Sequence, residues 1–334
     1  MTRLIRHIFG AALIVLMMAA AQAQPLNIRI GYSDAAMHLT PVLFLNKSIL
    51  KHYGKSYTFE TRQFVGGPPQ IAALAANEID IIAASFQSLP QIINKAKLDV
   101  RVIADVIQSS VPGFADMLFM AKKGRFKSPA DLKGSTIAVG ALGSGLDASI
   151  RDYLSRYNLV ADRDYTIVEV RFSAMLVALE SGRIDVGSLA PPMSIDAEEK
   201  GEYEAVFKYA DMIGPNQAGM WIAQTDWLNK NRATLTDFFE DFLISRRWFL
   251  DPKNRDEAIK LVAGVTKRPP AAYQSWLLTK RDWFRDPDGR PAVEMIQNNI
   301  DNSLKAKTLD SGLTVKDHVD LSFVEEARRR VDGK

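Results

Sequence analysis

Short polar and glycine-containing stretches follow the predicted strands at several points of this sequence. The first part of the chain places in such stretches Ser33, Asp34, His38, Phe64, Gly66, Gly67, Ser85 and Phe86. A later stretch contributes Ser144, Gly145 and Leu146. Ligands of open α/β sheets bind beyond the carboxyl ends of the strands, where helix N-termini offer free N–H groups and a positive partial charge. The pattern therefore predicts a binding site for a small organic acid or another oxyanion.

Aromatic and apolar residues near the same strand ends are predicted to form the walls of this site. They are Phe64, Phe86, Phe172, Pro191 and Trp221. Some candidates also have purely structural explanations. Trp221 can fill the core, and His38 can cap or solvate the first helix. Ser85 and Ser144 are as well suited to helix caps as to ligand contacts.

Two arginines near strand ends, Arg62 and Arg171, are capable of holding a carboxylate through paired hydrogen bonds. Arginines at such positions are more often solvated surface residues, and we prefer that interpretation for both.

The chain contains two similar segments, at residues 57–86 and 165–192. Each reads as a strand, a loop, a helix and a second strand, which is about one βαβ unit. Asp80 and Asp185 occupy matching places, just after the helix of each copy. We expect a shared structural role for them rather than catalysis. Two related units predict two similar lobes, and small ligands usually bind in the cleft between lobes.

The first 23 residues have the features of a secretory signal peptide. Arg3 and Arg6 form a basic region, residues 8–20 form an apolar region that is too short for a permanent membrane span, and residues 21–23 form an A-x-A cleavage site. A buried N-terminal helix is the less favoured interpretation. We expect the mature chain to begin at Gln24 and to be a soluble protein of the periplasm.

Composition narrows the classes of function. The 334 residues are 47% hydrophobic and 24% charged, as in ordinary globular proteins. A net charge of +3 gives no basic field for nucleic acid. The chain has no cysteine, which excludes disulfides, thiolate metal sites and cysteine nucleophiles. No pair of the four histidines has metal-ligand spacing. We expect no metal, no cofactor and no catalytic residue.

Hydrophobic periodicity predicts an α/β protein. Strands are expected at residues 26–31, 57–64, 79–84, 100–107, 116–121, 136–140, 205–207 and 220–224. Helices are expected at 41–51, 69–77, 89–96, 146–157, 235–249, 256–265, 271–278, 292–305 and 321–330. The helices after residue 218 have no counterpart in the repeat and should pack on the first lobe. Lobe I would then comprise residues 24–110 and 216–334, and lobe II residues 111–215, joined by two hinge crossings.

Several stretches resemble one known family. They are IRIGYSDAAMHLTPVLFL at 28–45, ALAANEIDIIAAS at 73–85, SPADLKGSTIAVGALGSGLDASIRDYL at 128–154 and ALESGRIDVGSLAPP at 178–192. The chain resembles the type II periplasmic solute-binding proteins of ABC importers, in the nitrate, sulfonate and taurine branch that includes NMT1/THI5-like proteins. The resemblance implies the two-lobed type II fold, with each lobe a mixed sheet flanked by helices. It also implies a monomer that delivers a small anionic organic solute to an ABC permease in the inner membrane.

Enzymatic motifs are scarce. The chain lacks H-E-x-x-H, a P-loop and the G-x-S-x-G elbow. The pyrimidine synthases of the NMT1/THI5 group carry a cysteine-rich motif that a chain without cysteine cannot have. An exported enzyme on the same scaffold, acting on a pyrimidine or cofactor precursor, remains the alternative hypothesis. A sensor module that presents its ligand to a membrane receptor is a third.

Overall fold

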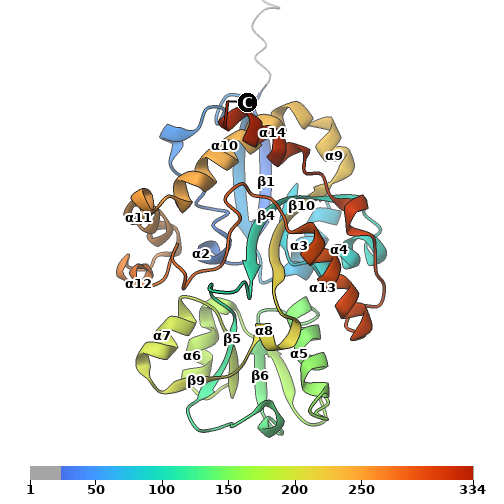
Figure 1. Cartoon of the computed structure of the whole chain (residues 1–334), viewed down its shortest axis with the longest axis vertical. Coiled ribbons are helices and arrows are strands. Elements are labelled where there is room, and N and C mark those ends of the chain that lie inside the picture. Colours follow the sequence, from blue (N-terminus) through green and yellow to red (C-terminus); the bar gives the residue numbers. More distant parts are fainter. Residues whose placement is uncertain (1–23, 334) are drawn as a thin grey trace, which may run out of the picture.

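Two five-stranded mixed sheets form the framework of the molecule, one in each of two lobes (Figure 1). The structure is a computed structural model that describes residues 24–333. The predicted signal peptide, residues 1–23, lies outside the described residues. Among the described residues, no helix combines the length and the apolar character that crossing a membrane requires.

The first sheet, which defines lobe I, has the strand order β2-β1-β3-β10-β4. Its strands are β1 (Leu26–Tyr32), β2 (Tyr57–Gln63), β3 (Ile81–Ala84), β4 (Val100–Ser109) and β10 (Asn216–Gln224). Strand β1 pairs in parallel with β2 and β3, whereas β10 runs antiparallel to β3 and β4. All four residues of β3 are buried, as the apolar run at this point predicts for a strand covered on both faces.

The second sheet, which defines lobe II, has the order β7-β6-β8-β5-β9. Its strands are β5 (Leu118–Lys122), β6 (Thr136–Val139), β7 (Thr166–Glu169), β8 (Val186–Leu189) and β9 (Tyr203–Lys208). Here β6 is parallel to β7 and β8, and β5 is antiparallel to β8 and β9. The two sheets thus repeat one plan, and the chain passes from one to the other between β4 and β5 and again before β10. This confirms the predicted two-lobed fold, while the residue limits of the lobes stay a prediction.

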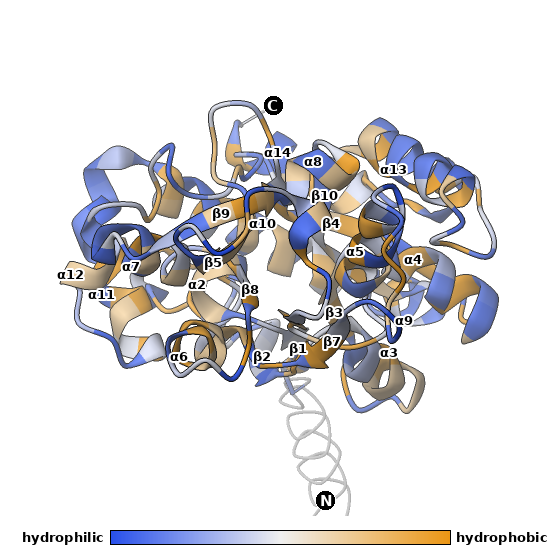
Figure 2. Cartoon of the chain, turned by 90° about the horizontal axis from the view of Figure 1, so that it is seen from below, coloured by the Kyte–Doolittle hydropathy of each residue, from blue (hydrophilic) through white to orange (hydrophobic). Residues whose placement is uncertain are grey.

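Helices cover both sheets (Figure 1). In lobe I they are α2 (Ala35–His38), α3 (Gly67–Ala75), α4 (Ser88–Pro90), α9 (Thr225–Lys230), α10 (Arg232–Leu250), α11 (Arg255–Thr266), α12 (Ala271–Gln274), α13 (Val293–Lys305) and α14 (Ser322–Val331). In lobe II they are α5 (Gly145–Ser155), α6 (Met175–Glu180), α7 (Met193–Lys200) and α8 (Tyr209–Ile213). Short 3-10 turns lie at Lys47–Ile49, Pro129–Asp131, Phe172–Ala174, Pro252–Asn254 and Val315–His318, and a π-helical turn at Gln91–Lys95 follows α4. Helices such as α13 alternate between hydrophobic and hydrophilic residues, as a helix with one face on a sheet requires (Figure 2).

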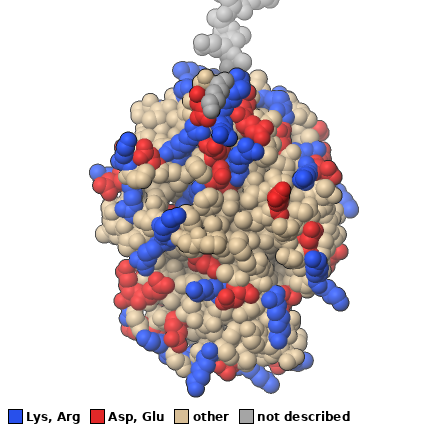
Figure 3. Space-filling model, in the orientation of Figure 1, with Lys and Arg blue, Asp and Glu red and all other residues tan. Residues whose placement is uncertain are grey.

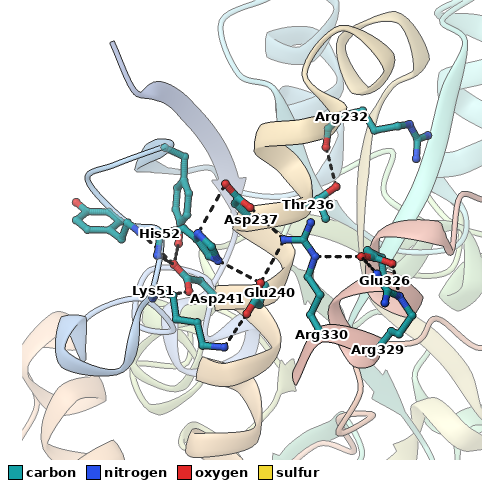
Figure 4. A network of polar contacts seen from close by, with 12 residues as sticks. Lys51, His52, Arg232, Thr236, Asp237, Glu240, Asp241, Glu326, Arg329 and Arg330 are labelled. Atoms are coloured by element: carbon teal, nitrogen blue, oxygen red, sulfur yellow. Dashed lines mark hydrogen bonds and ion pairs between the residues drawn. The ribbon is translucent and has the colours of Figure 1, made fainter. Parts of the chain in front are cut away.

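The C-terminal third packs on lobe I, as expected. Helix α10 lies on the first sheet, where the Phe238 ring lies 5.2 Å from that of Tyr57 on β2. Helix α14 packs against α10 in turn. Asp241 of α10 is fully buried, and its carboxylate accepts hydrogen bonds from the backbone N–H groups of Lys51, His52 and Tyr53 (Figure 4). The segment before β2 is thereby tied to the C-terminal helices.

The helix predicted at residues 41–51 is wrong. Helix α2 ends at His38, followed by Leu39 in the left-handed region, and the chain continues in turns and a 3-10 segment. Val42, Leu43 and Phe44 are all buried in succession. A surface helix needs a polar face, and this apolar run has none, so core packing decides its conformation. The helix predicted at 271–278 is also shorter than expected, since α12 ends at Gln274.

Candidate functional site

A cavity lies between the lobes, where the ends of strands from both sheets face each other. Lobe I contributes Ser33, Met37, His38, Val65, Gly66, Gly67, Pro68, Ala83, Ala84, Ser85, Ser88, Gln91, Ile107, Ser109, Ala218 and Trp283. Lobe II contributes Met117, Ala141, Ser144, Gly145, Leu146, Phe172 and Tyr209. Among these lining residues none is Asp, Glu, Lys or Arg. The cavity is therefore built of apolar groups, hydroxyls and backbone.

Most of the residues predicted from the sequence meet in this cavity. They are Ser33, His38, Gly66, Gly67, Ser85, Ser144, Gly145, Leu146 and Phe172. They lie close together because each follows the carboxyl end of a strand, and the carboxyl ends of parallel strands share one edge of each sheet. Phe172 stands where it does because Gly140 has no side chain. A Cβ on Gly140 would lie 2.4 Å from the Phe172 ring.

Five predicted residues do not line the cavity: Asp34 and Phe64, which line a neighbouring hollow, and the buried Phe86, Trp221 and Pro191. Phe86 is fully buried in the core, because successive side chains at a strand end point in opposite directions and Ser85 takes the cavity side. Trp221 is fully buried in the middle of β10, with its ring 4.7 Å from that of Phe242 on α10. Pro191 is buried where the chain turns from β8 directly into α7. The structural explanation for Trp221 is the one that the geometry supports.

Asp34 and Phe64 line a second hollow that adjoins the main cavity. This hollow shares Ser33, Val65 and Phe172 with the cavity. The exposed Arg171 also lines it. The Asp34 carboxylate accepts a 2.8 Å hydrogen bond from Met37 N–H and so caps α2. Arg62 instead forms an exposed ion pair with Glu78 at 2.8 Å, in agreement with its interpretation as a surface residue.

The N-terminus of α5 offers backbone donors to the cavity. The Ser144 hydroxyl accepts a long 3.4 Å hydrogen bond from Asp147 N–H, so Ser144 caps the helix and lines the cavity at once. The N–H groups of Gly145 and Leu146, at the first two helical positions, have no acceptor within the helix. Together with the helix dipole they form a site that favours an anion.

Helix α3 opens toward the same cavity with fewer donors. Its first three residues are Gly67, Pro68 and Pro69, and proline has no backbone N–H. Lobe I supplies side-chain donors instead. The fully buried Gln70 holds this region together, because its amide group donates to Ser33 Oγ at 3.2 Å and to the carbonyls of Gly66 and Ala83.

His38 is an uncharged group of the lobe I wall. Burial, with a smaller contribution from the nearby Arg285 guanidinium, lowers the pKa of His38 to about 4. Its Nδ1 accepts a long 3.4 Å hydrogen bond from Ser33 N–H, which places the ring proton on Nε2. His38 is thus a neutral hydrogen-bond donor near pH 7. Arg285 also donates to the Met37 carbonyl at 2.8 Å and so fixes this wall.

Sequence reasoning missed two aromatic residues of the cavity, Trp283 and Tyr209. Trp283 is 3% exposed, and its Nε1–H has no acceptor among the described residues. A buried donor without a partner is costly unless a water or a ligand satisfies it. Trp283 follows no strand that the sequence pattern marked, so no local signal could have found it. Tyr209 closely follows the strand predicted at 205–207, so the rule that ligands bind beyond strand ends could have included it.

The two lobes touch around the cavity. A Cβ on Gly66 would lie 2.8 Å from Ala141 Cβ of the facing lobe, so glycine is required there by close approach. At one side Arg268 forms an ion pair with Asp196 of α7 at 2.7 Å. The two lobes are therefore in direct contact beside the cavity.

Comparison with known proteins places this architecture in a family. Residues 64–273, more than half of the chain, match the family described as NMT1/THI5 like. The chain belongs to the NMT1/THI5-like family. Curated relatives of this NMT1/THI5-like chain include a candidate binding protein of Brucella abortus, which is 31% identical over 178 residues. That match covers 52% of this chain and 51% of the relative, so it extends over about half the length of each.

Solved structures share the fold of this NMT1/THI5-like protein. The alkanesulfonate-binding protein SsuA from Xanthomonas axonopodis pv. citri, bound to MOPS, has a TM-score of 0.68 at 20% identity. The alignment covers 90% of this chain and 99% of SsuA. The periplasmic nitrate-binding protein NrtA from Synechocystis PCC 6803 has a TM-score of 0.69 at 12% identity, covering 93% of this chain and 90% of NrtA. The predicted fold of periplasmic solute-binding proteins is thereby confirmed.

Proposed function

We propose that this protein is the periplasmic substrate-binding component of an ABC transporter. It captures a small organic anion, such as a sulfonate or carboxylate, in the cleft between its lobes and delivers it as a monomer to a permease of the inner membrane. The observation that carries the proposal is the inter-lobe cavity, which combines a helix N-terminus, hydroxyls and apolar walls. SsuA and NrtA, whose names specify small anions, share the fold.

The anionic end of the solute is proposed to meet the N-terminus of α5. There the N–H groups of Gly145 and Leu146 and the hydroxyl of Ser144 converge without a cationic side chain. Backbone donors at a helix start bind oxyanions without a formal positive charge. The apolar remainder of the solute would lie against Met37, Trp283 and their neighbours in lobe I.

Binding rather than catalysis is favoured by the side chains of the cavity. Its lining contains no carboxylate, lysine or arginine, and its one histidine has a pKa lowered to about 4 and an occupied Nδ1. General acid–base catalysis needs a proton-transferring group whose pKa lies near the working pH. Among the described residues that line the cavity, no carboxylate, lysine or histidine has the properties of such a group.

A thermal-shift panel tests the proposal. The probes are nitrate, methanesulfonate, butane-1-sulfonate and butyrate, with butan-1-ol as an uncharged control of matched chain length. At a concentration of 100 Kd a ligand stabilises the folded state by about 2.7 kcal/mol, which raises the melting temperature by several degrees. Stabilisation by at least one anion and not by butan-1-ol supports the proposal. A panel without any stabilising anion, or equal stabilisation by butan-1-ol, contradicts the anion class.

A further inference from the structure

Gln87 of lobe I reaches across the cleft into lobe II. It follows β3 and is 3% exposed. Its Nε2 donates to Ser149 Oγ of α5 at 3.4 Å and to the Tyr209 hydroxyl of α8 at 3.3 Å. Both acceptors belong to lobe II, so these contacts join the two lobes.

The start of α5 is shaped to receive this side chain. A Cβ on Gly145 would lie 2.2 Å from Gln87 Cδ and 2.4 Å from its Oε1. No side chain fits at position 145 while Gln87 occupies its place. Gln87 therefore packs on the same helix end that presents the N–H groups of Gly145 and Leu146 to the cavity.

The Tyr209 hydroxyl connects Gln87 to the cavity. Tyr209 lines the cavity, and its backbone N–H donates to the Met117 carbonyl at 3.0 Å, which fixes its position beside β5. The hydroxyl also bonds the Ser149 side chain. Because its oxygen accepts from Gln87, its own proton can turn either to Ser149 Oγ or to an oxygen of a solute in the cavity. In the second orientation the hydroxyl is a donor for the solute.

We infer that Gln87 is a positioning residue that holds the Tyr209 hydroxyl in place to donate to an oxygen of the bound solute when the lobes are closed. The inference rests on the proposed function and deepens it. Recognition of the solute then depends on a residue pair drawn from both lobes. Solutes whose acceptor oxygen reaches Tyr209 are selected over those without such an oxygen.

A double-mutant cycle tests the pair by calorimetric titration with butane-1-sulfonate. We expect Tyr209→Phe and Gln87→Leu each to raise Kd at least about tenfold, and the double variant to bind no more weakly than the weaker single variant, because Gln87 acts through Tyr209. Tyr153→Phe is the matched control, since its hydroxyl pairs with Tyr157 at 3.3 Å outside the cavity. An unchanged Kd in Gln87→Leu, or effects that add in the double variant, overturns the inference.

A measurement without ligand separates this inference from the proposed function. The chain has no cysteine, so spin labels on Leu45→Cys of lobe I and Val177→Cys of lobe II, both exposed, report the distance between lobes cleanly. Gln87→Leu in this background should give longer and broader distances in the free protein. If the wild type binds none of the probes, the proposal that the protein binds a small anion is wrong. A Gln87→Leu protein that nevertheless keeps wild-type lobe distances overturns the role of Gln87 itself.

Discussion

Lobe I and lobe II repeat one sheet plan but present different chemistry to the cavity between them. In lobe II the donors are backbone N–H groups at the start of α5, at Gly145 and Leu146. In lobe I the helix after the equivalent strand β1 is only the four-residue α2, where Asp34 already accepts from Met37 N–H. Helix α3, which also opens toward the cavity, begins Gly67-Pro68-Pro69, and two of these three residues have no N–H. Side chains such as His38 and Trp283 supply donors there instead. A repeated fold therefore does not produce a repeated site.

The lobes also differ in what stabilises them. Lobe I carries the C-terminal third, and buried or half-buried polar contacts join α10 to the segment before β2 and to α14 (Figure 4). Lobe II has no such addition. Charges of both signs are interspersed over the face shown in Figure 3, so no single-sign field distinguishes one lobe there. The two lobes therefore differ in their buried polar contacts rather than in the charges on this face.

The largest expected effect concerns the anchor of lobe I. Asp241→Ala should lower the free energy of unfolding by at least about 3 kcal/mol, because the buried carboxylate accepts from three backbone N–H groups and from the Tyr57 hydroxyl. Chemical denaturation measures it. Asp237→Ala, on the same helix but partly exposed, is the control and should cost less than about 1 kcal/mol. Equal losses in the two variants would contradict the special role of Asp241.

The pH dependence of the free energy of unfolding tests whether His38, on the cavity wall of lobe I, is uncharged in the folded protein. Burial and Arg285 lower the pKa of His38 to about 4, whereas the unfolded chain has a histidine pKa near 6.5. Between these two values only the unfolded chain takes up a proton. The contribution of His38 is therefore complete above pH 6.5 and is lost as the pH falls toward 4.

The loss amounts to at most about 3 kcal/mol for a shift of this size. Denaturation curves of the wild type and of His38→Gln between pH 7 and pH 4 measure it. We expect the wild type to lose more stability than the variant over this range. Parallel pH profiles would show that His38 protonates as easily in the folded protein as in the unfolded chain.

Two buried tryptophans provide a matched test of which wall contacts the solute. The indole N–H groups of Trp283 and Trp221 both lack an acceptor among the described residues, but only Trp283 lines the cavity. Trp283→Phe should weaken butane-1-sulfonate binding about tenfold and reduce the ligand-induced fluorescence change. Trp221→Phe should leave Kd unchanged. The reverse result would move the site toward α10.

The smallest expected effect concerns the mouth of the cavity. Arg171 is exposed in the adjoining hollow and contributes positive potential there. Arg171→Ala should slow anion association about two- to threefold at low salt, and the difference should vanish at high salt. Stopped-flow fluorescence measures the rate. Arg183→Ala, which removes the same charge from an exposed site outside the hollow, should associate like the wild type.

The repeated aspartates show how far local sequence carries. Asp80 and Asp185 were predicted to share a structural role, and each accepts a 2.8 Å hydrogen bond from the backbone N–H of a neighbouring parallel strand, at Arg29 and Thr136 respectively. This shared role could be predicted because the helix, the aspartate and the strand that follows lie within a few residues of one another in each copy. The strands and the donor-rich stretches after them were predictable for the same reason.

The sequence by itself determined the two-lobed α/β plan, the strand ends that bear ligand donors and the absence of cysteine chemistry, because hydrophobic period and residue type are local properties. Only the tertiary structure decided that Trp283 rather than Trp221 lines the cavity, that residues 41–51 form no helix, and that Gln87 reaches Gly145 and Tyr209. These outcomes depend on which elements pack together across long sequence separations. Close packing of side chains from distant segments decides these three outcomes. No short stretch of sequence encodes that packing.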